Sequence, residues 1–378
     1  MTAPQVQVLL VSAQAAPNLL PAIDPALKPK HAVLVVTQKM QRQAGALQKV
    51  LTESGIKVTQ AQLVDEHRID QIESVLMNIA AEHEGVDIAL NLTGGTKLMA
   101  LAAQTVASVA SWRSFYVDVD TDEVIWIGRH APASLQLTSQ LRLSHYLRAY
   151  GFSLENGVDR PAPEARHTEA LDTLVMQVGS LAQPLSQLNY LAQIAEDKKS
   201  LIVEIGRDRN THGSLPQLLT VFEKAGCLQV QGDHIRFRNE LERDFVKGGW
   251  LEHHVFRRVT ALHGSLELRD KAANLTVTDG TGVKNEMDIA FLARNRLWVI
   301  ECKTARMDFP THAKANDTLF KLAEVCRRVG GIGTRGMLVS YRPVRESEKK
   351  LATALNIEVV CGAEIQRLQE RITRWVRN

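Results

Sequence analysis

Residues 285–304 read NEMDIAFLARNRLWVIECKT, and this stretch decides the fold of the C-terminal part of the chain. It contains two apolar runs rich in β-branched residues, MDIAFL and LWVIECK, joined by a short connection at 293–296. Such a pattern predicts a β-hairpin of two largely buried strands. We place its turn between Arg294 and Asn295, which fixes the residues that face each other across the strands.

Charged side chains gather at the end of this hairpin that lies away from the turn. Successive side chains of a strand point to opposite faces, so Glu301 and Lys303 share one face and Cys302 points away. In the predicted register Asp288 lies opposite Glu301, with the two β-carbons about 5 Å apart. Two carboxylates and an ammonium are therefore expected to converge at the end of a buried strand.

Two carboxylates at this distance repel each other, and a buried unpaired charge is strongly unfavourable. A divalent cation would resolve the conflict, and carboxylate oxygens suit Mg²⁺ and Mn²⁺ equally. Lys303 would then orient or deprotonate the attacking water, or hold the scissile phosphate. The alternative is an edge hairpin with an ordinary Glu–Lys pair, but the upstream Asp288 and the apolar strand favour a catalytic site.

The pattern Asp288…Glu301-Cys302-Lys303 resembles the PD-(D/E)-x-K core of restriction-endonuclease-like nucleases. That family places a further acid on the helix before the hairpin, and Glu252 in the stretch GGWLEHHV holds the matching position. The resemblance implies that the catalytic residues are Glu252, Asp288, Glu301 and Lys303. It also implies that the metal ligands are Asp288, Glu301 and the backbone carbonyl of Cys302, with Glu252 as a further candidate.

The match departs from the family pattern at Met287, where the family usually has a proline before the aspartate. Glu286 is a second acid nearby and stays an alternative ligand. His253 and His254 are adjacent, so they face different directions and cannot form the i, i+4 pair of a metal site. We expect both histidines at the surface, with His254 as a candidate for substrate contact.

The composition is that of an ordinary globular protein of two or three domains: 378 residues, 45% hydrophobic and 23% charged. The net charge of +3 permits a polyanionic partner without requiring one. No apolar run approaches the roughly 20 residues that span a membrane, and residues 6–11 lack the basic flank of a signal peptide. We therefore expect a cytoplasmic protein without membrane association. Four scattered cysteines fit reduced thiols rather than disulfides or a zinc site: Cys227, Cys302, Cys326 and Cys361.

Strands alternate with helices over residues 1–150, which predicts a parallel, doubly wound α/β sheet. Such sheets bind ligands at the carboxyl ends of their strands, where the strand order reverses. The predicted strands are 5–11, 31–36, 56–60, 86–92, 114–118 and 123–128, the helices are 42–54, 70–84 and 98–110, and 12–18 is a loop.

The loop NLTGGTKLM at 91–99 joins a predicted buried strand to a helix. Its two glycines let the backbone approach a ligand closely, and the N–H groups of a helix N-terminus bind anions. Thr93, Thr96 and Lys97 add hydroxyl and ammonium donors. A Walker A motif is excluded because G-K-[ST] is absent. An equally good interpretation of the loop alone is a tight turn with Thr96 as the N-cap.

Together with Ser12 and Thr37-Gln38 at two other strand ends, TGGTK resembles the CARF domain (CRISPR-associated Rossmann fold), over about residues 5–130. That family binds cyclic oligoadenylates across a two-fold dimer, so the resemblance implies a homodimer. Cyclic tetra-adenylate is the expected ligand, because relatives with this domain pairing commonly use it. The implied ligand-binding residues are Thr93, Gly94, Gly95, Thr96 and Lys97, with Ser12, Gln14, Thr37 and Gln38 as secondary contacts.

Residues 151–240 are interpreted as a separate middle segment. The stretch SLENGVDRPAPEARHT at 153–168 is polar and rich in turn residues, which predicts a linker. Helical patterns over 171–195 and 214–224, followed by a hairpin over 228–238, resemble a winged-helix module. A packing spacer between domains is the alternative.

The order αβββαβ over residues 241–378 fits the restriction-endonuclease-like core. The predicted helices are 250–262, 318–329 and 363–376, and the strands are 266–268, 275–278, the hairpin, 336–340 and 357–360. The last helix carries four arginines at a spacing of three to four residues, which form either a solvated face or a phosphate-tracking surface: Arg367, Arg371, Arg374 and Arg377.

A ring-nucleotide sensor followed by a PD-(D/E)-x-K domain resembles the ancillary effectors of type III CRISPR systems. We therefore predict an α/β protein with an N-terminal CARF sensor, a middle segment and a C-terminal nuclease domain that cleaves RNA or DNA. A regulator that binds nucleic acid without cutting is the alternative, but it leaves Asp288, Glu301 and Lys303 unexplained. Degradation of the ligand by the sensor is compatible with the sequence as a side activity.

Overall fold

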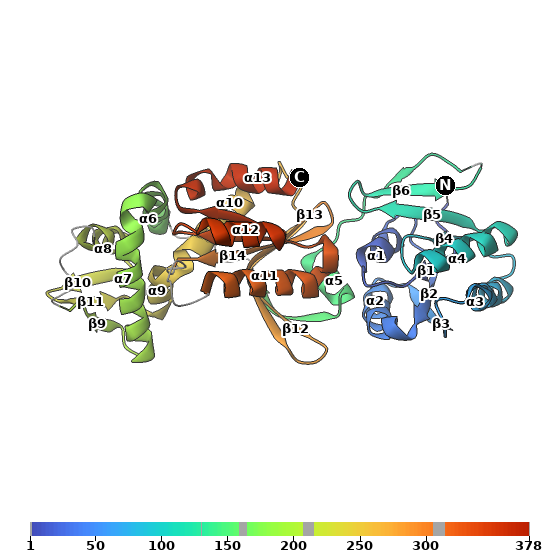
Figure 1. Ribbon diagram of the computed structural model, residues 1–378, viewed down its shortest axis with the longest axis horizontal. Helices are drawn as coiled ribbons and strands as arrows, with labels where there is room; N and C mark the ends of the chain where they lie inside the picture. Colours follow the sequence, from blue (N-terminus) through green and yellow to red (C-terminus); the bar gives the residue numbers. More distant parts are fainter. Residues whose placement is uncertain (1, 130, 159–164, 207–214, 305–313, 378) are drawn as a thin grey trace.

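The computed structural model of the protein describes residues 2–129, 131–158, 165–206, 215–304 and 314–377. Figure 1 shows three units in a row: the N-terminal sheet at one end, a large mixed sheet in the middle, and helices with a small sheet at the other end. The predicted α/β class is confirmed. Within the described ranges, no helix is both long and apolar enough to cross a membrane.

The N-terminal sheet has seven strands: β1 (Val6–Leu10), β2 (His31–Thr37), β3 (Lys57–Leu63), β4 (Ile88–Asn91), β5 (Arg113–Asp118), β6 (Glu123–Ile127) and β7 (Leu135–Gln136). Their order is β3-β2-β1-β4-β5-β6-β7, with β1 to β5 parallel. The order reverses between β1 and β4, which is therefore the topological switch point of the sheet. The helices are α1 (Ala16–Ile23), α2 (Gln41–Glu53), α3 (Ile69–Glu82) and α4 (Lys97–Val109).

Helices cover both faces of this sheet. Neighbouring residues of one strand pack into different hydrophobic cores, Leu9 with Leu34 on one face and Leu10 with Val35 on the other. A sheet buried on both faces is expected when every parallel crossover is helical. The prediction of a doubly wound sheet is therefore confirmed.

Helix α1 differs from the prediction, because it begins at Ala16 inside the stretch predicted as a loop. Pro17 lies in its first turn, where a missing N–H removes no intrahelical hydrogen bond. Leu19 and Leu20 are fully buried, so tertiary packing stabilises a helix that its two prolines disfavour. Local propensity alone could not have found it.

The middle segment contains α6 (Ala165–Met176), α7 (Val178–Asp197), β9 (Ile202–Glu204), α8 (Leu215–Lys224), β10 (Leu228–Gln231) and β11 (His234–Phe237). Its antiparallel sheet has the order β10-β11-β9. Strand β9 thus adds a third strand to the predicted hairpin. The helix–strand–helix–hairpin order is compatible with the winged-helix-like prediction, and residue 214 lies outside the described residues.

The predicted linker is wrong at its N-terminal end. Strand β8 (Phe152–Val158) pairs with the large central sheet, and the side chain of Asn156 accepts a hydrogen bond from the Thr276 backbone N–H. Phe152 is buried whereas Ser153 and Glu155 are exposed, as expected of an edge strand with one solvated face. Those polar residues produced the linker prediction. Residues 159–164 of the predicted linker lie outside the described residues.

The central sheet has the order β16-β15-β14-β13-β12-β8, with β14, β15 and β16 parallel. Its other strands are antiparallel, and residues 266–268 form no strand. The strands are β12 (Asp270–Asp279), β13 (Lys284–Ala293), β14 (Arg296–Lys303), β15 (Arg335–Ser340) and β16 (Ile357–Cys361). The helices are α5 (Leu143–Ala149), α9 (Glu240–Asp244), α10 (Trp250–Ala261), α11 (Lys314–Gly330), α12 (Glu346–Ala354) and α13 (Leu368–Arg377), with a π-helical turn at Phe245–Gly249.

Strands β13 and β14 form the predicted hairpin in the predicted register. Arg294 and Asn295 both have φ of 52°, the left-handed pair that a two-residue type I′ turn requires. The ladder runs outward from this turn to Ile289 opposite Ile300. The paired ladder ends there. Asp288 is the next residue beyond it, and its carboxylate lies near enough to Glu301 for the two charges to interact.

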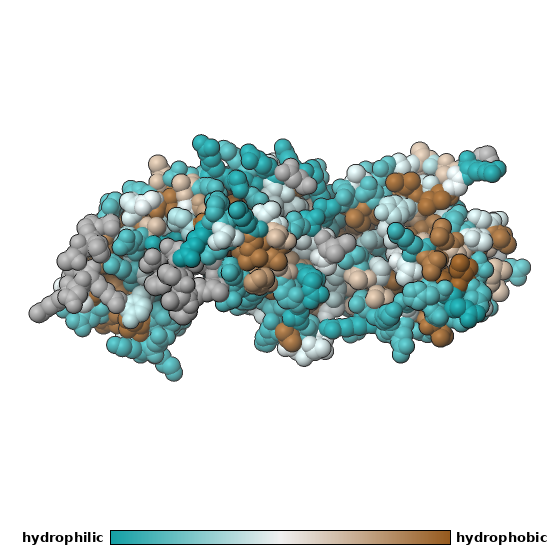
Figure 2. Space-filling view, viewed as in Figure 1, coloured by the Kyte–Doolittle hydropathy of each residue, from teal (hydrophilic) through white to brown (hydrophobic). Residues whose placement is uncertain are grey.

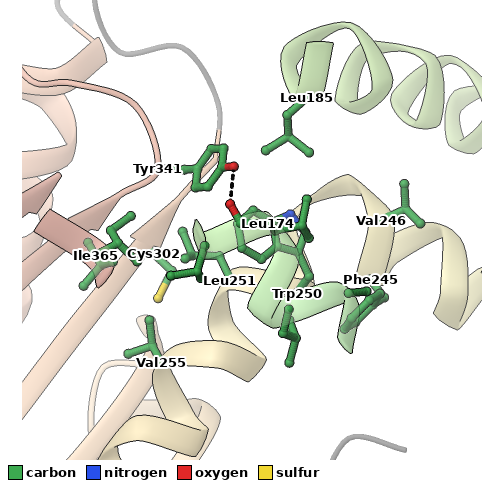
Figure 3. Packing of buried hydrophobic residues seen from close by; sticks show 14 of the residues in the cluster. Leu174, Leu185, Phe245, Val246, Trp250, Leu251, Val255, Cys302, Tyr341 and Ile365 are labelled. Atoms are coloured by element: carbon green, nitrogen blue, oxygen red, sulfur yellow. Dashed lines mark hydrogen bonds between the residues drawn. The ribbon is translucent and has the colours of Figure 1, made fainter. Parts of the chain in front are cut away.

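A third hydrophobic core joins the central sheet to the middle segment. Trp250 and Tyr341 are fully buried and pack edge to face, with ring centroids 4.9 Å apart. Figure 3 shows the Tyr341 hydroxyl pointing at the Leu174 carbonyl oxygen, to which it donates a 2.6 Å hydrogen bond. Leu174 lies in the last turn of α6, where carbonyls have no intrahelical donor.

We expect Tyr341→Phe to destabilise the protein by about 1–3 kcal/mol, because the Leu174 carbonyl would remain buried without a donor. The midpoint of urea unfolding measures this change. Tyr116→Phe is the matched control, since the Tyr116 side chain on β5 is 46% exposed and the substitution keeps its apolar ring. Equal midpoints for the two variants would contradict this account of the core.

Candidate functional site

Asp288 lies at a kink in the central sheet. Asn274, in the facing strand β12, has a left-handed φ of 52°, and the ladder passes from the pair Ala273–Ile289 to the pair Leu275–Met287. Met287 and Ile289 consequently pack into different hydrophobic cores, although a regular strand would place them on one face. The kink turns the Asp288 carboxylate toward β14, where its Oδ2 accepts a 2.7 Å hydrogen bond from the Cys302 backbone N–H.

Glu301 and Lys303 share one face of β14, and their side chains form an ion pair. The Glu301 side chain is only 12% exposed. Burial opposes the charge on Lys303, but the carboxylates of Glu301 and Asp288 outweigh it and raise the pKa of the ammonium. Lys303 is therefore a fixed cation, suited to hold a phosphate or orient a water rather than to remove a proton. Cys302 points away into the core, as predicted, and burial raises the pKa of its thiol.

The pKa of Asp288 is raised to about 7, mainly by burial and next by the neighbouring Glu301 carboxylate. Lys303 lowers this pKa, but by less than Glu301 raises it. The carboxyl group thus resists ionisation while no cation is near. Two hard oxygen donors from adjacent strands suit Mg²⁺ or Mn²⁺, whose charge would offset their mutual repulsion. The residues present therefore fit the metal that the sequence predicts.

Glu252 lies in the first turn of α10, half-buried, and its charge also raises the pKa of Asp288. Its carboxylate, with those of Asp288 and Glu301, does not form a group of three within 4.8 Å. The start of α10 is held against the residue after Lys303, since a Cβ at Gly248 would lie 2.8 Å from Thr304 Oγ1. This close approach of Gly248 to Thr304 was not predicted, and no motif in the sequence signals it.

His254 is not at the surface, contrary to the prediction. It lies one helical turn after Leu251 on the inward face of α10 and is fully buried. Burial lowers its pKa to about 3, so the ring is neutral and takes no part in an ionic contact with substrate. Glu286 is exposed and lines a separate cavity with Lys321 and Arg328.

The predicted ligand loop after β4 is held from within by Thr93. Its hydroxyl donates to Asn91 Oδ1 at 2.7 Å and accepts from the Val117 backbone N–H at 2.7 Å. Asn91 in turn donates to Asn18 Oδ1 and to the Pro17 carbonyl. The Thr93 hydroxyl thus uses one donor and one acceptor function within the fold.

The other loop residues shape the N-terminus of α4. A Cβ at Gly94 would lie 2.0 Å from the carbonyl oxygen at the end of β1, so only glycine fits there. Gly95 has φ of +71°. Thr96 is the N-cap, accepting from the backbone N–H three residues on, and both Thr96 and Lys97 are exposed. The N-cap interpretation of Thr96 is confirmed, and α4 still presents an exposed N-terminus beside an ammonium.

The four residues predicted as secondary ligand contacts lie in two different places. Ser12 and Gln14 line a cavity of about 600 Å³ between the N-terminal sheet and α11, and Gln14 Oε1 accepts a hydrogen bond from the Tyr150 hydroxyl. Thr37 is buried at the end of β2, whereas Gln38 after it is exposed. The lining of the cavity does not include residues 93–97.

The arginines of α13 do not all share one role. Arg371 is bound to the Glu358 carboxylate and the Val359 carbonyl of β16. A groove of about 800 Å³ is lined by Glu370 and by four other arginines: two on α13, one just before it and one on α10. These groove arginines are Arg258, Arg367, Arg374 and Arg377.

Two family models match the chain. The Card1 CARF domain matches residues 6–146, and the Card1-like endonuclease domain matches residues 239–378. A comparison with curated proteins gives no match.

Solved structures resemble nearly the whole chain. Protein VC1899 from Vibrio cholerae is 24% identical with a TM-score of 0.90, covering 98% of both chains. Can2 from Sulfobacillus thermosulfidooxidans, in complex with cyclic tetra-adenylate, is 25% identical with a TM-score of 0.82, covering 99% of this chain and 98% of Can2. A type III CRISPR defence DNA nuclease activated by cyclic oligoadenylate is 20% identical with a TM-score of 0.55, and the match covers 94% of this chain and 48% of that one.

We expect Mn²⁺ binding to weaken roughly tenfold per unit of pH below about pH 7, because the cation must displace the proton that burial retains on Asp288. Calorimetry in two buffers of different ionisation enthalpy would measure both affinity and proton release. Asp288→Asn should lose both the tight binding and the proton release. An affinity that stays constant between pH 5 and pH 7 would contradict the assignment.

The folding stability of the metal-free protein should change with pH in the direction opposite to Mn²⁺ affinity. Folded Asp288 binds its proton more tightly than the unfolded chain does, so its contribution to folding stability falls as pH rises from about 4 to about 7. Asp288→Asn should remove that part of the pH dependence in unfolding experiments.

Proposed function

Because this chain carries the CARF and endonuclease domains of the Card1 family, we propose that it is a metal-dependent endonuclease of type III CRISPR defence, activated by cyclic oligoadenylate. The observation that carries the proposal is the pair Asp288 and Glu301, held together in a half-buried site beside the cation Lys303. Two carboxylates so arranged have little structural value, whereas phosphodiester hydrolysis by a bound cation needs them. The match of Can2, bound to cyclic tetra-adenylate, to the whole chain supports the ligand.

The roles of the residues follow from their positions. Mg²⁺ or Mn²⁺, held by Asp288 and Glu301 with the Cys302 carbonyl, would supply Lewis-acid activation of water and stabilisation of negative charge. Lys303 stays charged and would hold the scissile phosphate or orient the attacking water. Glu252, farther from the pair, would orient water or hold a second cation.

Ring-nucleotide binding would take place at the switch point of the N-terminal sheet. The exposed N-terminus of α4 and the Lys97 ammonium suit a phosphate. Gly94 and Gly95 would allow close approach of the ligand to the backbone. Thr96, Gln38 and Ser12 are candidates for further contacts, whereas Thr93 would act by shaping the loop.

A homodimer would form through the N-terminal unit. Leu101 and Val109 on α4 are 66% and 74% exposed. Tyr116 of β5 and Ile125 and Ile127 of β6 are also exposed, and Figure 2 shows hydrophobic surface over this end of the molecule. Exposed apolar side chains gathered in this way favour an interface, and a two-fold ligand fits an isologous one.

We expect cleavage of a labelled nucleic acid only when Mn²⁺ and cyclic tetra-adenylate are both present. Single-stranded RNA, single-stranded DNA and supercoiled plasmid, tested separately, would identify the substrate. Glu301→Gln should reduce the rate by at least about a thousandfold, because it removes a metal ligand and the partner of Lys303.

The control for folding is ligand binding by the same variant. Glu301→Gln should retain its affinity for cyclic tetra-adenylate, since Glu301 belongs to the central sheet. Ligand binding by the wild-type protein without cleavage of any of the three substrates would instead favour the non-cutting regulator.

We expect Arg374→Gln with Arg377→Gln to weaken substrate binding and to reduce the salt slope of affinity by about one unit per lost phosphate contact. The rate at saturating substrate should stay unchanged. Arg371→Gln is the matched control on the same helix, because Glu358 already engages that guanidinium. Equal salt slopes for wild type and the double variant would rule out the groove as a substrate surface.

A further inference from the structure

The turn of the catalytic hairpin rests on the sensor. Asn295 is 3% exposed, and its Nδ2 donates a 2.5 Å hydrogen bond to Asp122 Oδ1 in the turn between β5 and β6. The next residue, Arg296, forms an ion pair with Asp120 of the same sensor turn. The two central strands of the nuclease sheet are thus attached, at the end opposite Asp288 and Glu301, to the N-terminal unit.

The sensor turn is itself well anchored. The Gln136 side-chain amide donates to the carbonyl oxygens of Thr121 and Asp122 at 2.8 and 2.9 Å. The Leu137 N–H also donates to the Asp122 carbonyl, at 2.8 Å. A turn fixed by these three hydrogen bonds can transmit a displacement rather than absorb it.

Strand β5 connects this turn to the ligand loop. Just before the turn, the Val117 N–H donates to the Thr93 hydroxyl at 2.7 Å, and the Leu92 N–H donates to the Phe115 carbonyl at 2.9 Å. The loop that would bind the ring nucleotide is therefore hydrogen-bonded directly to the end of β5 that leads into the turn holding Asn295. Only residues 118–121 lie between Val117, which contacts the loop, and Asp122, which contacts Asn295.

We propose that Asn295 and Arg296 are positioning residues, which tie the catalytic hairpin to the sensor turn at Asp120 and Asp122 so that ligand binding at residues 92–97 displaces the hairpin. The inference rests on the proposed function and adds the route of its regulation. Because β13 and β14 are continuous from the turn to Asp288 and Glu301, a shift at the turn changes the placement of both carboxylates.

Hydrogen exchange of the full-length protein, with and without cyclic tetra-adenylate, tests the route. In the wild type, ligand should change exchange at residues 92–97 and in the hairpin at 289–302. Asn295→Gly keeps the left-handed turn but removes the amide, so the change at 92–97 should persist and the change in the hairpin should disappear. Arg294→Gly, at the exposed neighbouring turn position, should behave like wild type.

Cleavage assays give a second readout. Asn295→Gly should lower ligand-stimulated cleavage at least about fivefold. Arg296→Asp should do likewise, and Asp120→Arg in the same chain should restore activity, a rescue that a merely structural role does not predict. A hairpin that responds to ligand equally in Asn295→Gly and wild type would overturn the route while leaving the proposed function intact. Absence of any ligand effect at 92–97 in the wild type would instead refute the sensor.

Discussion

The repulsion between Asp288 and Glu301 is the constraint on which the rest of the nuclease half depends. Adjacent antiparallel strands bring the two carboxylates together in a site too buried for water to screen them, and the raised pKa of Asp288 records the cost. The fold tolerates that cost because Lys303 and the Cys302 backbone N–H each offset part of it. A bound cation would offset the remaining repulsion, and the kink at Asn274 lies in the strand that faces Asp288.

In the sensor half, buried hydrogen bonds rather than charges fix the loop that follows β4. Its loop after β4 is held by a chain of buried amides and hydroxyls running from Asn18 through Asn91 to Thr93, which leaves the following residues, Thr96 and Lys97, exposed. One hydrophobic core includes residues of both halves, among them Leu34 of β2 and Leu319 of α11. The two functional ends are therefore parts of a continuous packed body, in which displacement at one end can reach the other.

The hairpin and the doubly wound sheet of the N-terminal unit could be predicted from sequence because they follow from local patterns of residues. The register of the hairpin follows from a two-residue turn and strand alternation, so Asp288 could be placed opposite Glu301 without coordinates. The predictions that were wrong concern features that contacts between distant parts of the fold determine. Packing stabilises α1 despite its prolines, β8 is polar because it is an edge strand, and His254 is buried because α10 needs a filled position there. Arg371 does not join the predicted basic face because α13 packs beside β16, where Glu358 binds its guanidinium.

Strand β8 has a consequence for dividing the protein into fragments. The central sheet begins with a strand at 152–158 and resumes with β12 only after the whole middle segment, so the nuclease unit is discontinuous in sequence. A fragment cut at residue 239, where the endonuclease match begins, would lack its edge strand and leave the outer N–H and C=O groups of β12 open. Open strand edges template association between chains. An excised nuclease domain would therefore be prone to aggregate for a reason unrelated to its active site.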